Sequence, residues 1–398
     1  MKLGIQRRST CTFTRTEPGR VGPVGPKVRV SVECETDLRS DRGDTPRLCL
    51  IFAISLLLLR GIAIGAEGEA PKESPRDWKA NPAIVSLSMP VDGDLYAMGD
   101  AHGDVEVMAR LLAGTGIIRG IPARPDAVQW AAGKSVLVIT GDFIDRYDHS
   151  MEVIAMLRAL QSRAAEAGGR VVITMGNHEA EFLAGGGENK KAEQFGQELH
   201  AAGLSPTDVA SGRDAAGIGL FLRNLPMAAR VGDWFFCHAG NTHGQTITEL
   251  EEALEKGIVA EGFAAPILSD PDSLLEARMH PRPWWLASPT VDMHDVPSNA
   301  AGHSDDPGKV RLEENLAALG ARHLVFGHQP GKLEFPDGTQ RAKGQVFMKY
   351  DGLVFLIDTG MSRGVDAGRG AVLKIHSTKR GATVSAVYAD RQETMLQP

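Results

Sequence analysis

The stretch VLVITGDFIDR, residues 136–146, contains the pattern that decides the fold. Its first five residues are apolar or β-branched and do not alternate with polar residues, which predicts a strand buried on both faces. Gly141, Asp142, Asp145 and Arg146 come directly after it. Because α/β folds place their sites at the carboxyl ends of strands, this stretch predicts both a sheet and a site at its edge.

Four other apolar runs end in the same way. They cover residues 95–98, 171–175, 234–237 and 324–326, and they are followed by Gly99-Asp100, Gly176-Asn177, His238 and Gly327-His328. Apolar residues at helical spacing occupy 105–112 and 150–167, and two late strands are expected at 353–358 and 371–376. The order strand, helix, strand predicts an α/β fold.

The segments after these runs are rich in side chains of the types that bind metal ions. They are Asp100, His102, Asp104, Asp142, Asp145, Asn177, His178, Glu179, His238 and His328. Oxygen ligands mixed with imidazoles suit Mn, Fe or Zn, whereas a structural zinc site would be rich in thiolates. Adjacent glycines allow the sharp turns that let such side chains converge. We therefore predict a metal site at this edge of the sheet.

The five motifs GDAHGD (99–104), GDFIDR (141–146), GNHE (176–179), HAG (238–240) and GH (327–328), in this order, resemble those of the calcineurin-like metallophosphoesterase superfamily. The resemblance covers about residues 94 to 360. It implies a β-sandwich flanked by helices, with a two-metal site at the carboxyl ends of strands.

The resemblance also implies which of these residues bind the two metal ions. Asp100 and His102 would bind the first ion, Asp142 would bridge both ions, and Asn177, His238 and His328 would complete the second site. The expected cofactors are two divalent ions, with Mn expected before Fe or Zn. Two such ions about 3.5–4 Å apart can hold a bridging hydroxide, which would attack phosphorus.

Four further residues acquire catalytic roles from the resemblance. Asp145 and His178 resemble the Asp–His pair that protonates the leaving oxygen, and Arg146 would hold phosphate oxygens with its planar guanidinium. Arg278 is the expected second phosphate arginine, with Arg282 as the alternative. Glu276 stands where the related branch has Trp, so the choice between these two arginines stays open.

The last motif indicates a branch of the superfamily. Gly327-His328-Gln329-Pro330 lacks the second histidine of the common Gly-His-x-His pattern. Together with Asp145-Arg146 and GNHE, it resembles the phosphoprotein phosphatase group, and within that group the bacterial Shewanella-like members. Tyr147 stands where this group has glycine, which leaves the backbone conformation of its loop open.

Composition excludes several classes of protein. The chain has 398 residues, of which 42% are hydrophobic and 23% charged, and a formal net charge of −7. These values exclude a disordered, collagen-like or coiled-coil chain. The acidic balance argues against nucleic-acid binding, which needs clustered cations. Four scattered cysteines are too few for a disulfide framework.

The N-terminal part differs from the rest. Residues 1–47 are expected to be disordered or to be an extension from a mis-assigned translation start, and 48–66 to be a signal peptide or membrane anchor, because the uninterrupted apolar run is only about twelve residues long. Residues 67–90 are predicted as a linker and 91–398 as the metallophosphoesterase domain, with insertions at about 180–224 and 243–315. The protein is therefore expected to be exported, to the periplasm or outside the cell, or to be anchored.

The predicted function is metal-dependent hydrolysis of a phosphomonoester, with a Ser/Thr- or Tyr-phosphorylated protein as substrate. One alternative is a hydrolase of small phosphate esters or dinucleoside polyphosphates. The other, from a different class, is a non-catalytic module that binds metal or phosphate. The expected partner is the phosphorylated substrate, and membrane contact is expected only through an N-terminal anchor.

Overall fold

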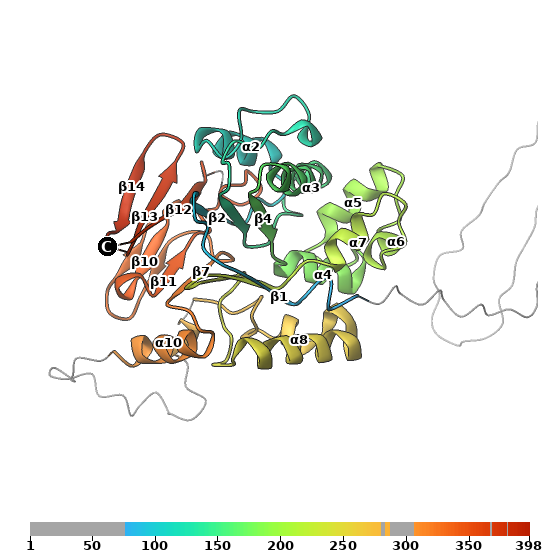
Figure 1. Ribbon diagram of the computed structural model, residues 1–398. Helices are drawn as coiled ribbons and strands as arrows, with labels where there is room; N and C mark the ends of the chain where they lie inside the picture. The colour runs from blue at the N-terminus through green and yellow to red at the C-terminus, as the bar shows by residue number, and fades with distance from the viewer. Residues whose placement is uncertain (1–75, 280–282, 287–305, 367, 380) are drawn as a thin grey trace, which may run out of the picture. The chain divides into compact units, whose positions relative to one another are not determined.

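Two six-stranded sheets form the centre of the folded chain (Figure 1). The computed structural model describes residues 76–279, 283–286, 306–366, 368–379 and 381–398. The first sheet contains, in spatial order, β1 (Ile84–Leu87), β5 (Ala228–Val231), β6 (Trp234–Cys237), β7 (His323–Phe326), β11 (Val354–Leu356) and β10 (Phe347–Lys349). The second contains β14 (Gln392–Leu396), β13 (Gly381–Tyr388), β12 (Ala371–Thr378), β2 (Leu95–Met98), β3 (Val136–Ile139) and β4 (Arg170–Ile173).

Each sheet mixes parallel and antiparallel pairs. Strands β2, β3 and β4 are parallel in the second sheet, and β6, β7 and β11 are parallel in the first. Strands β12, β13 and β14 extend the second sheet with antiparallel pairs. A separate short hairpin consists of β8 (Leu333–Glu334) and β9 (Gln340–Arg341).

The inner faces of the two sheets share one apolar core. Leu95 and Val138 of the second sheet belong to the same buried cluster as Phe236, Val325 and Phe355 of the first. The opposite faces of the central strands pack on helices, so these strands are buried on both sides and read as continuous apolar runs. This arrangement is the predicted β-sandwich flanked by helices.

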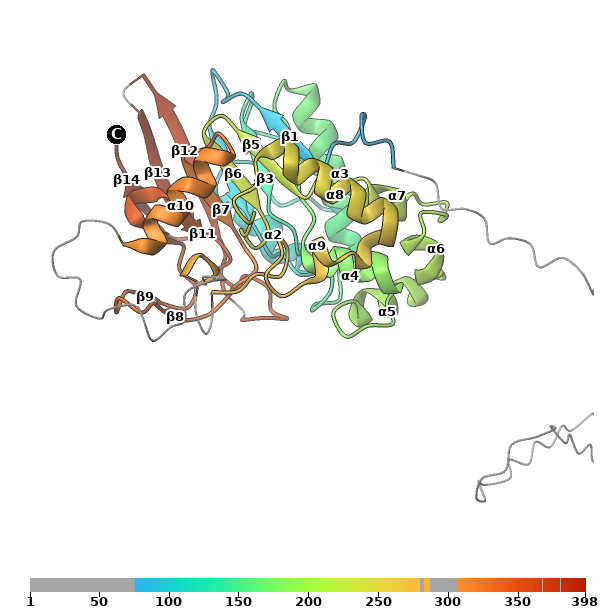
Figure 2. The same ribbon diagram turned by 90° about the horizontal axis from the view of Figure 1, so that it is seen from below.

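Helices cover both outer sides of the sandwich. Figure 1 shows α2 and α3 over the second sheet and α8 and α10 on the opposite side, and Figure 2 shows α8 and α10 in front of the first sheet. The bounds are α2 (Val105–Gly114), α3 (Ser150–Glu166), α4 (Asn177–Gly185), α5 (Glu193–Ala201), α6 (Pro206–Ala210), α7 (Ile218–Arg223), α8 (Ile247–Glu261), α9 (Pro266–Ser269) and α10 (Pro307–Ala318). The first predicted insertion contains α5, α6 and α7, and the second contains α8, α9 and α10.

The expected linker is partly folded, so the boundary at residue 91 is wrong. Strand β1 lies inside the range 67–90 and pairs in parallel with β5. The guanidinium of Arg76 donates to the carbonyl oxygens of Asn81, Pro82, Arg223 and Leu225. The two prolines that flank this strand, Pro82 and Pro90, make its sequence resemble a linker, although its backbone completes an edge of the first sheet.

The N-terminal predictions, for residues 1–47 and 48–66, lie outside the described residues. Within the described part, no helix is both long enough and apolar enough to cross a membrane. Export or anchoring therefore stays a prediction.

Candidate metal centre and active site

Loops from both sheets deliver the predicted metal-binding residues to one place. Asp100 and His102 follow β2, Asp142 follows β3, and Asn177 begins α4 after β4. From the first sheet, His238 follows β6 and His328 follows β7. All six side chains are buried. Strands β2, β3 and β4 are parallel to one another, and so are β6 and β7, so the carboxyl ends within each group meet at the same edge, as the sequence predicts.

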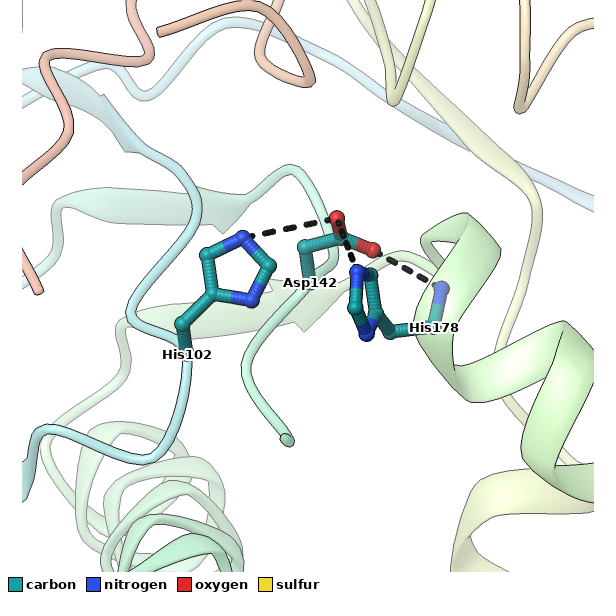
Figure 3. A group of neighbouring side chains, drawn as sticks. All are labelled: His102, Asp142 and His178. Atoms are coloured by element: carbon teal, nitrogen blue, oxygen red, sulfur yellow. Dashed lines mark hydrogen bonds and ion pairs between the residues drawn. The ribbon is translucent and has the colours of Figure 1, made fainter. Parts of the chain in front are cut away.

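The carboxylate of Asp142 lies at the middle of the site. Its Oδ2 atom is 3.6 Å from Nε2 of His102, 3.9 Å from Nε2 of His178 and 3.3 Å from Nε2 of His238. Figure 3 shows the rings of His102 and His178 approaching this carboxylate, while the backbone N–H of His178 donates to the other oxygen over 3.0 Å. A carboxylate in this position is placed to bridge two ions, the role that the family resemblance implies.

A second group of donors surrounds Nε2 of His238. It lies 3.0 Å from Oδ1 of Asn177 and 3.0 Å from Nδ1 of His328. The other ring nitrogen, Nδ1, is 2.8 Å from the carbonyl oxygen of Thr140, which fixes the orientation of the ring. Asp142, His238 and His328 each offer one atom within 4.8 Å of the others, which is close enough for a shared ion.

Two groups of three side chains have potential ligand atoms within 4.8 Å of one another: His102, Asp142 and His178, and Asp142, His238 and His328. Asp100 is buried beside these groups but belongs to neither. Its Oδ1 accepts the backbone N–H of His328 over 2.9 Å. Burial, followed by the charge of Asp358, raises the pKa of Asp100 well above its usual value. A buried carboxylate with a neighbouring carboxylate needs a cation to be stable in its charged form.

Two atoms test whether the residues fit a metal ion. Eight side-chain atoms of the described residues are buried without a hydrogen-bond partner, and Oδ2 of Asp100 and Nε2 of His328 are two of them. Such atoms cost free energy unless something binds them. Both belong to residues predicted as ligands, and both types of atom ligate divalent ions. The residues therefore fit a metal centre.

The site residues also share an uncommon backbone conformation. Nine non-glycine residues of the described chain have positive φ, and six of these are Asp100, His102, Asp142, Asp145, Arg146 and His328. This left-handed conformation costs of order 1–3 kcal/mol at a non-glycine residue. Its concentration at this edge is typical of a functional site, where packing holds strained residues in place.

Asp145 and His178 form the predicted pair. Nδ1 of His178 lies 3.4 Å from Oδ2 of Asp145, and both side chains are buried. The other oxygen, Oδ1, accepts the backbone N–H groups of Gln194 and Phe195 over 2.8 and 3.1 Å, so it caps α5. Burial alone would lower the pKa of His178, but the charges of Asp142 and Asp145 raise it above its usual value.

Two arginines lie at the rim of a cavity of about 250 Å³ that opens onto these residues. Arg146 and Arg278 line it together with His102, Asp142 and His178. Both arginines are exposed, and neither forms an ion pair within the described part of the chain. Arg278 thus reaches the cavity, whereas Arg282 lies outside the described residues.

The structure answers the question about Tyr147. The positive φ values fall on Asp145 and Arg146, so residue 147 does not need glycine. The guanidinium of Arg363 lies 4.6 Å from the centre of the Tyr147 ring and donates to both carboxylate oxygens of Asp104 over 2.9 and 2.8 Å. The loop after β11 therefore packs on the loop that presents Arg146.

Sequence reasoning gave no role to Glu179, the last residue of the GNHE motif. Its buried carboxylate accepts four backbone N–H groups, from Asp142, Phe143, Ile144 and Gly176, over 2.7 to 3.1 Å. It therefore fixes the loop that carries Asp142 relative to the start of α4. The available signal was its position at N3 of α4, where Glu commonly bonds back to the helix start.

Arg341 was also missed. It is 1% exposed and donates to the carbonyl oxygens of Gln329 over 2.5 Å, Gly331 over 2.7 Å and Asp358 over 3.2 Å. These carbonyls belong to the loops after β7 and β11, so one buried side chain joins two loops of the site. No local sequence pattern predicts this role, because Arg341 contacts the carbonyl oxygen of Asp358, which lies 17 residues away in the sequence.

Comparison with known proteins identifies the family. Residues 94–332 match the family described as calcineurin-like phosphoesterase. An uncharacterized protein of Schizosaccharomyces pombe is 26% identical over 302 residues, which cover 74% of this chain and 80% of that protein. Shewanella-like protein phosphatase 1 of Plasmodium berghei is 23% identical over 329 residues, covering 78% of this chain and 82% of the relative. This last similarity agrees with the predicted branch.

A solved structure supports the fold. The crystal structure of a cold-active protein-tyrosine phosphatase from a psychrophilic Shewanella species superposes with a TM-score of 0.55 at 20% identity, covering 79% of this chain and 82% of that one. The family match spans more than half of the chain and includes all the motifs that deliver the site. The chain therefore belongs to the calcineurin-like phosphoesterase family and is a hydrolase of phosphoester bonds.

Proposed function

We propose that this protein is a metal-dependent phosphomonoester hydrolase whose substrates are phosphorylated proteins. The observation that carries the proposal is one cavity lined by candidate metal ligands, by His178 of the Asp145–His178 pair and by two arginines. A module that only bound metal would have no use for the pair or for the arginines.

Asp100, His102 and Asp142 would hold one ion, and Asp142 with Asn177, His238 and His328 would hold the other. Divalent ions bound there would withdraw charge from the phosphoryl group and lower the pKa of a coordinated water molecule. The ligand chemistry, which mixes oxygen atoms with imidazole nitrogens, suits Mn, Fe or Zn, and Mn is the ion we propose first.

The chain's own residues would orient the substrate and supply a proton. Arg146 and Arg278 reach the cavity without a carboxylate partner among the described residues, so each can donate to a non-bridging phosphate oxygen. His178 lines the same cavity, and its Nδ1 faces Asp145. Its other nitrogen, Nε2, can therefore donate a proton to the leaving oxygen of the ester, and the raised pKa of His178 favours the protonated form that this step needs.

Two observations support a phosphoprotein substrate. The loop after β7 reads His328-Gln329-Pro330, without a second histidine. The relative from Plasmodium berghei is named a protein phosphatase. Both favour the phosphoprotein phosphatase branch over diesterases.

The test is a substrate profile of the purified full-length chain with Mn²⁺, Fe²⁺ or Zn²⁺. We expect hydrolysis of p-nitrophenyl phosphate and of phosphoserine, phosphothreonine or phosphotyrosine peptides, and much slower hydrolysis of bis-p-nitrophenyl phosphate. Asp142→Asn should remove both metal and activity. No hydrolysis of any monoester with any of these ions would contradict the proposal, and a preference for a dinucleoside polyphosphate would support the alternative substrate class.

A further inference from the structure

Lys191 reaches the cavity of the active site although no motif includes it. It lines the 250 Å³ cavity with Arg146, His178 and Arg278, and its side chain is 30% exposed. It comes from the segment between α4 and α5, in the first insertion.

Two carboxylates hold the ammonium group of Lys191. Its Nζ forms an ion pair with Glu181 and another with Oε1 of Glu276, the latter over 2.5 Å. Asn189 fixes the turn that presents this lysine, because its Oδ1 accepts the backbone N–H of Lys191 over 3.1 Å and its Nδ2 donates to the carbonyl oxygen of Glu181 over 2.8 Å. The position of Lys191 is thus determined by side chains on two segments.

Glu276 links this lysine to the segment of the second arginine. It is buried, and it lies two residues before Arg278. A neighbouring hollow of about 500 Å³ is lined by Glu181, Glu276 and Asp272, and it shares Lys191 and Arg278 with the cavity of the active site. Lys191 therefore lies at the boundary between the cavity of the active site and the neighbouring hollow, which is lined by three carboxylates.

The charges explain what Lys191 can do there. Glu181, Lys191 and Glu276 together carry a formal charge of −1, so the lysine screens two carboxylates that would otherwise repel a phosphate. A lysine has a flexible four-carbon stem and a mobile point charge. When a dianionic phosphoryl group enters, the ammonium can turn from the carboxylates to an oxygen that neither arginine binds.

We propose that Lys191 is a third cationic ligand of the substrate phosphoryl group, and that Glu181 and Glu276 hold it at the rim of the cavity until substrate binds. This inference rests on the proposed function and deepens it. A third cation favours a monoester, which carries two negative charges, over a diester, which carries one. Lys191 is thus a specificity-determining residue for phosphomonoesters.

The experiment measures inorganic phosphate binding by calorimetry on the Mn²⁺-loaded protein, so that it does not depend on turnover. Lys191→Gln should weaken phosphate binding about tenfold, the size expected for a charged hydrogen bond. Glu276→Gln should strengthen it about threefold, because one competitor for the ammonium is removed. Asp272→Asn is the matched control, since it removes one negative charge from the same hollow and leaves the contacts of Lys191 unchanged.

A second background separates ligation from screening. Glu181→Gln/Glu276→Gln protein lacks both carboxylates that pair with Lys191. In this background Lys191→Gln should still weaken phosphate binding about tenfold if the lysine binds phosphate. No effect in this background would overturn the inference and show that Lys191 only neutralises the two glutamates. If the double variant does not fold, as judged by its circular dichroism, Glu181→Ala/Glu276→Gln protein, which also lacks both carboxylates, serves as the background.

Activity distinguishes this inference from the proposed function. In Lys191→Gln, the ratio of kcat/KM for p-nitrophenyl phosphate to that for bis-p-nitrophenyl phosphate should fall about tenfold. A wild-type protein that prefers the monoester, combined with an unchanged ratio in the variant, would overturn the role of Lys191 alone. A wild-type protein that neither binds phosphate nor hydrolyses the monoester would overturn both.

Discussion

At the scale of single residues, Asp145 shows how one side chain can serve both structure and chemistry. One carboxylate oxygen accepts two backbone N–H groups at the start of α5, and the other faces His178. Helix capping by a carboxylate typically stabilises by about 1 kcal/mol. The first insertion therefore positions the carboxylate that orients the proposed acid.

His178→Asn tests the division between metal binding and proton donation. The variant loses the ring that lies 3.4 Å from Asp145, but it retains the six predicted ligands. We expect kcat to fall about 100-fold or more, which is typical of a lost general acid, while bound metal measured by atomic emission stays at the wild-type level. The loss should be smaller for p-nitrophenyl phosphate, whose leaving group needs little protonation, than for phosphoserine peptides. Equal losses on both would argue against an acid.

Glu179 offers a second test at this scale. Both carboxylate oxygens of Glu179 accept backbone N–H groups. In Glu179→Gln the side-chain NH₂ replaces one of these oxygens, so a donor faces backbone N–H donors. We expect a loss of about 2–4 kcal/mol in the free energy of unfolding, measured by denaturant titration. Glu261→Gln, at an exposed position, is the control and should change stability by less than about 0.5 kcal/mol. An unchanged midpoint for the Glu179 variant would contradict its structural role.

At the scale of elements, the loop after β11 limits where Arg146 can lie. Ser362 donates to the carbonyl oxygen of His102 over 3.1 Å, and a Cβ added at Gly364 would lie 2.2 Å from the carbonyl oxygen of Arg146. Since the φ of Gly364 is not positive, only this close approach requires glycine there. The loop therefore packs directly against the backbone of Arg146.

Gly364→Ala should displace Arg146 by several tenths of an ångström or more, because carbon and oxygen do not approach to 2.2 Å. We expect kcat/KM for monoesters to fall by up to about 100-fold, the cost of misplacing a substrate-positioning group by about 1 Å. Gly120→Ala is the control, since nothing lies within 4 Å of its added carbon. Wild-type kinetics in the Gly364 variant would show that the loop yields without moving the arginine.

The elements that the sequence predicted share a local signal. Strands such as β3 and β6 are short apolar runs that end in a site motif, and they appear where they were expected. Strand β5, with the sequence AARV, has no such signal, and β1 is flanked by prolines. Pairing with other strands defines both: β1 pairs with β5, and β5 pairs with β1 and β6. The same reason hid Arg341 and Lys191, whose partners lie on distant segments.

At the scale of the whole molecule, the site depends on both sheets. Asp100 and Asp142 come from the second sheet, whereas His238, His328 and Asp358 come from the first. Burial raises the pKa of Asp358 to about 6, which shows that negative charge is costly here. Bound divalent ions would offset this cost and tie the two halves of the sandwich together.

Metal binding should therefore stabilise the fold. A ligand that binds only the folded state at 100 times its Kd contributes about 2.7 kcal/mol. We expect Mn²⁺ to raise the Tm by several degrees and excess chelator to reverse the change, followed by scanning calorimetry. Asp142→Asn should abolish the rise, since the shared carboxylate is lost. A Tm that does not respond to Mn²⁺, Fe²⁺ or Zn²⁺ would contradict a metal centre between the sheets.

The left-handed backbone of the site has a consequence for protein engineering. Arg146 is exposed, has a φ of 65° and forms no ion pair within the described chain, so glycine would relieve its strain by roughly 1 kcal/mol. A screen that selects heat resistance alone should therefore enrich Arg146→Gly and similar changes at this edge. Variant libraries of this enzyme would then become enriched in thermostable but inactive variants unless every round of selection also requires phosphatase activity.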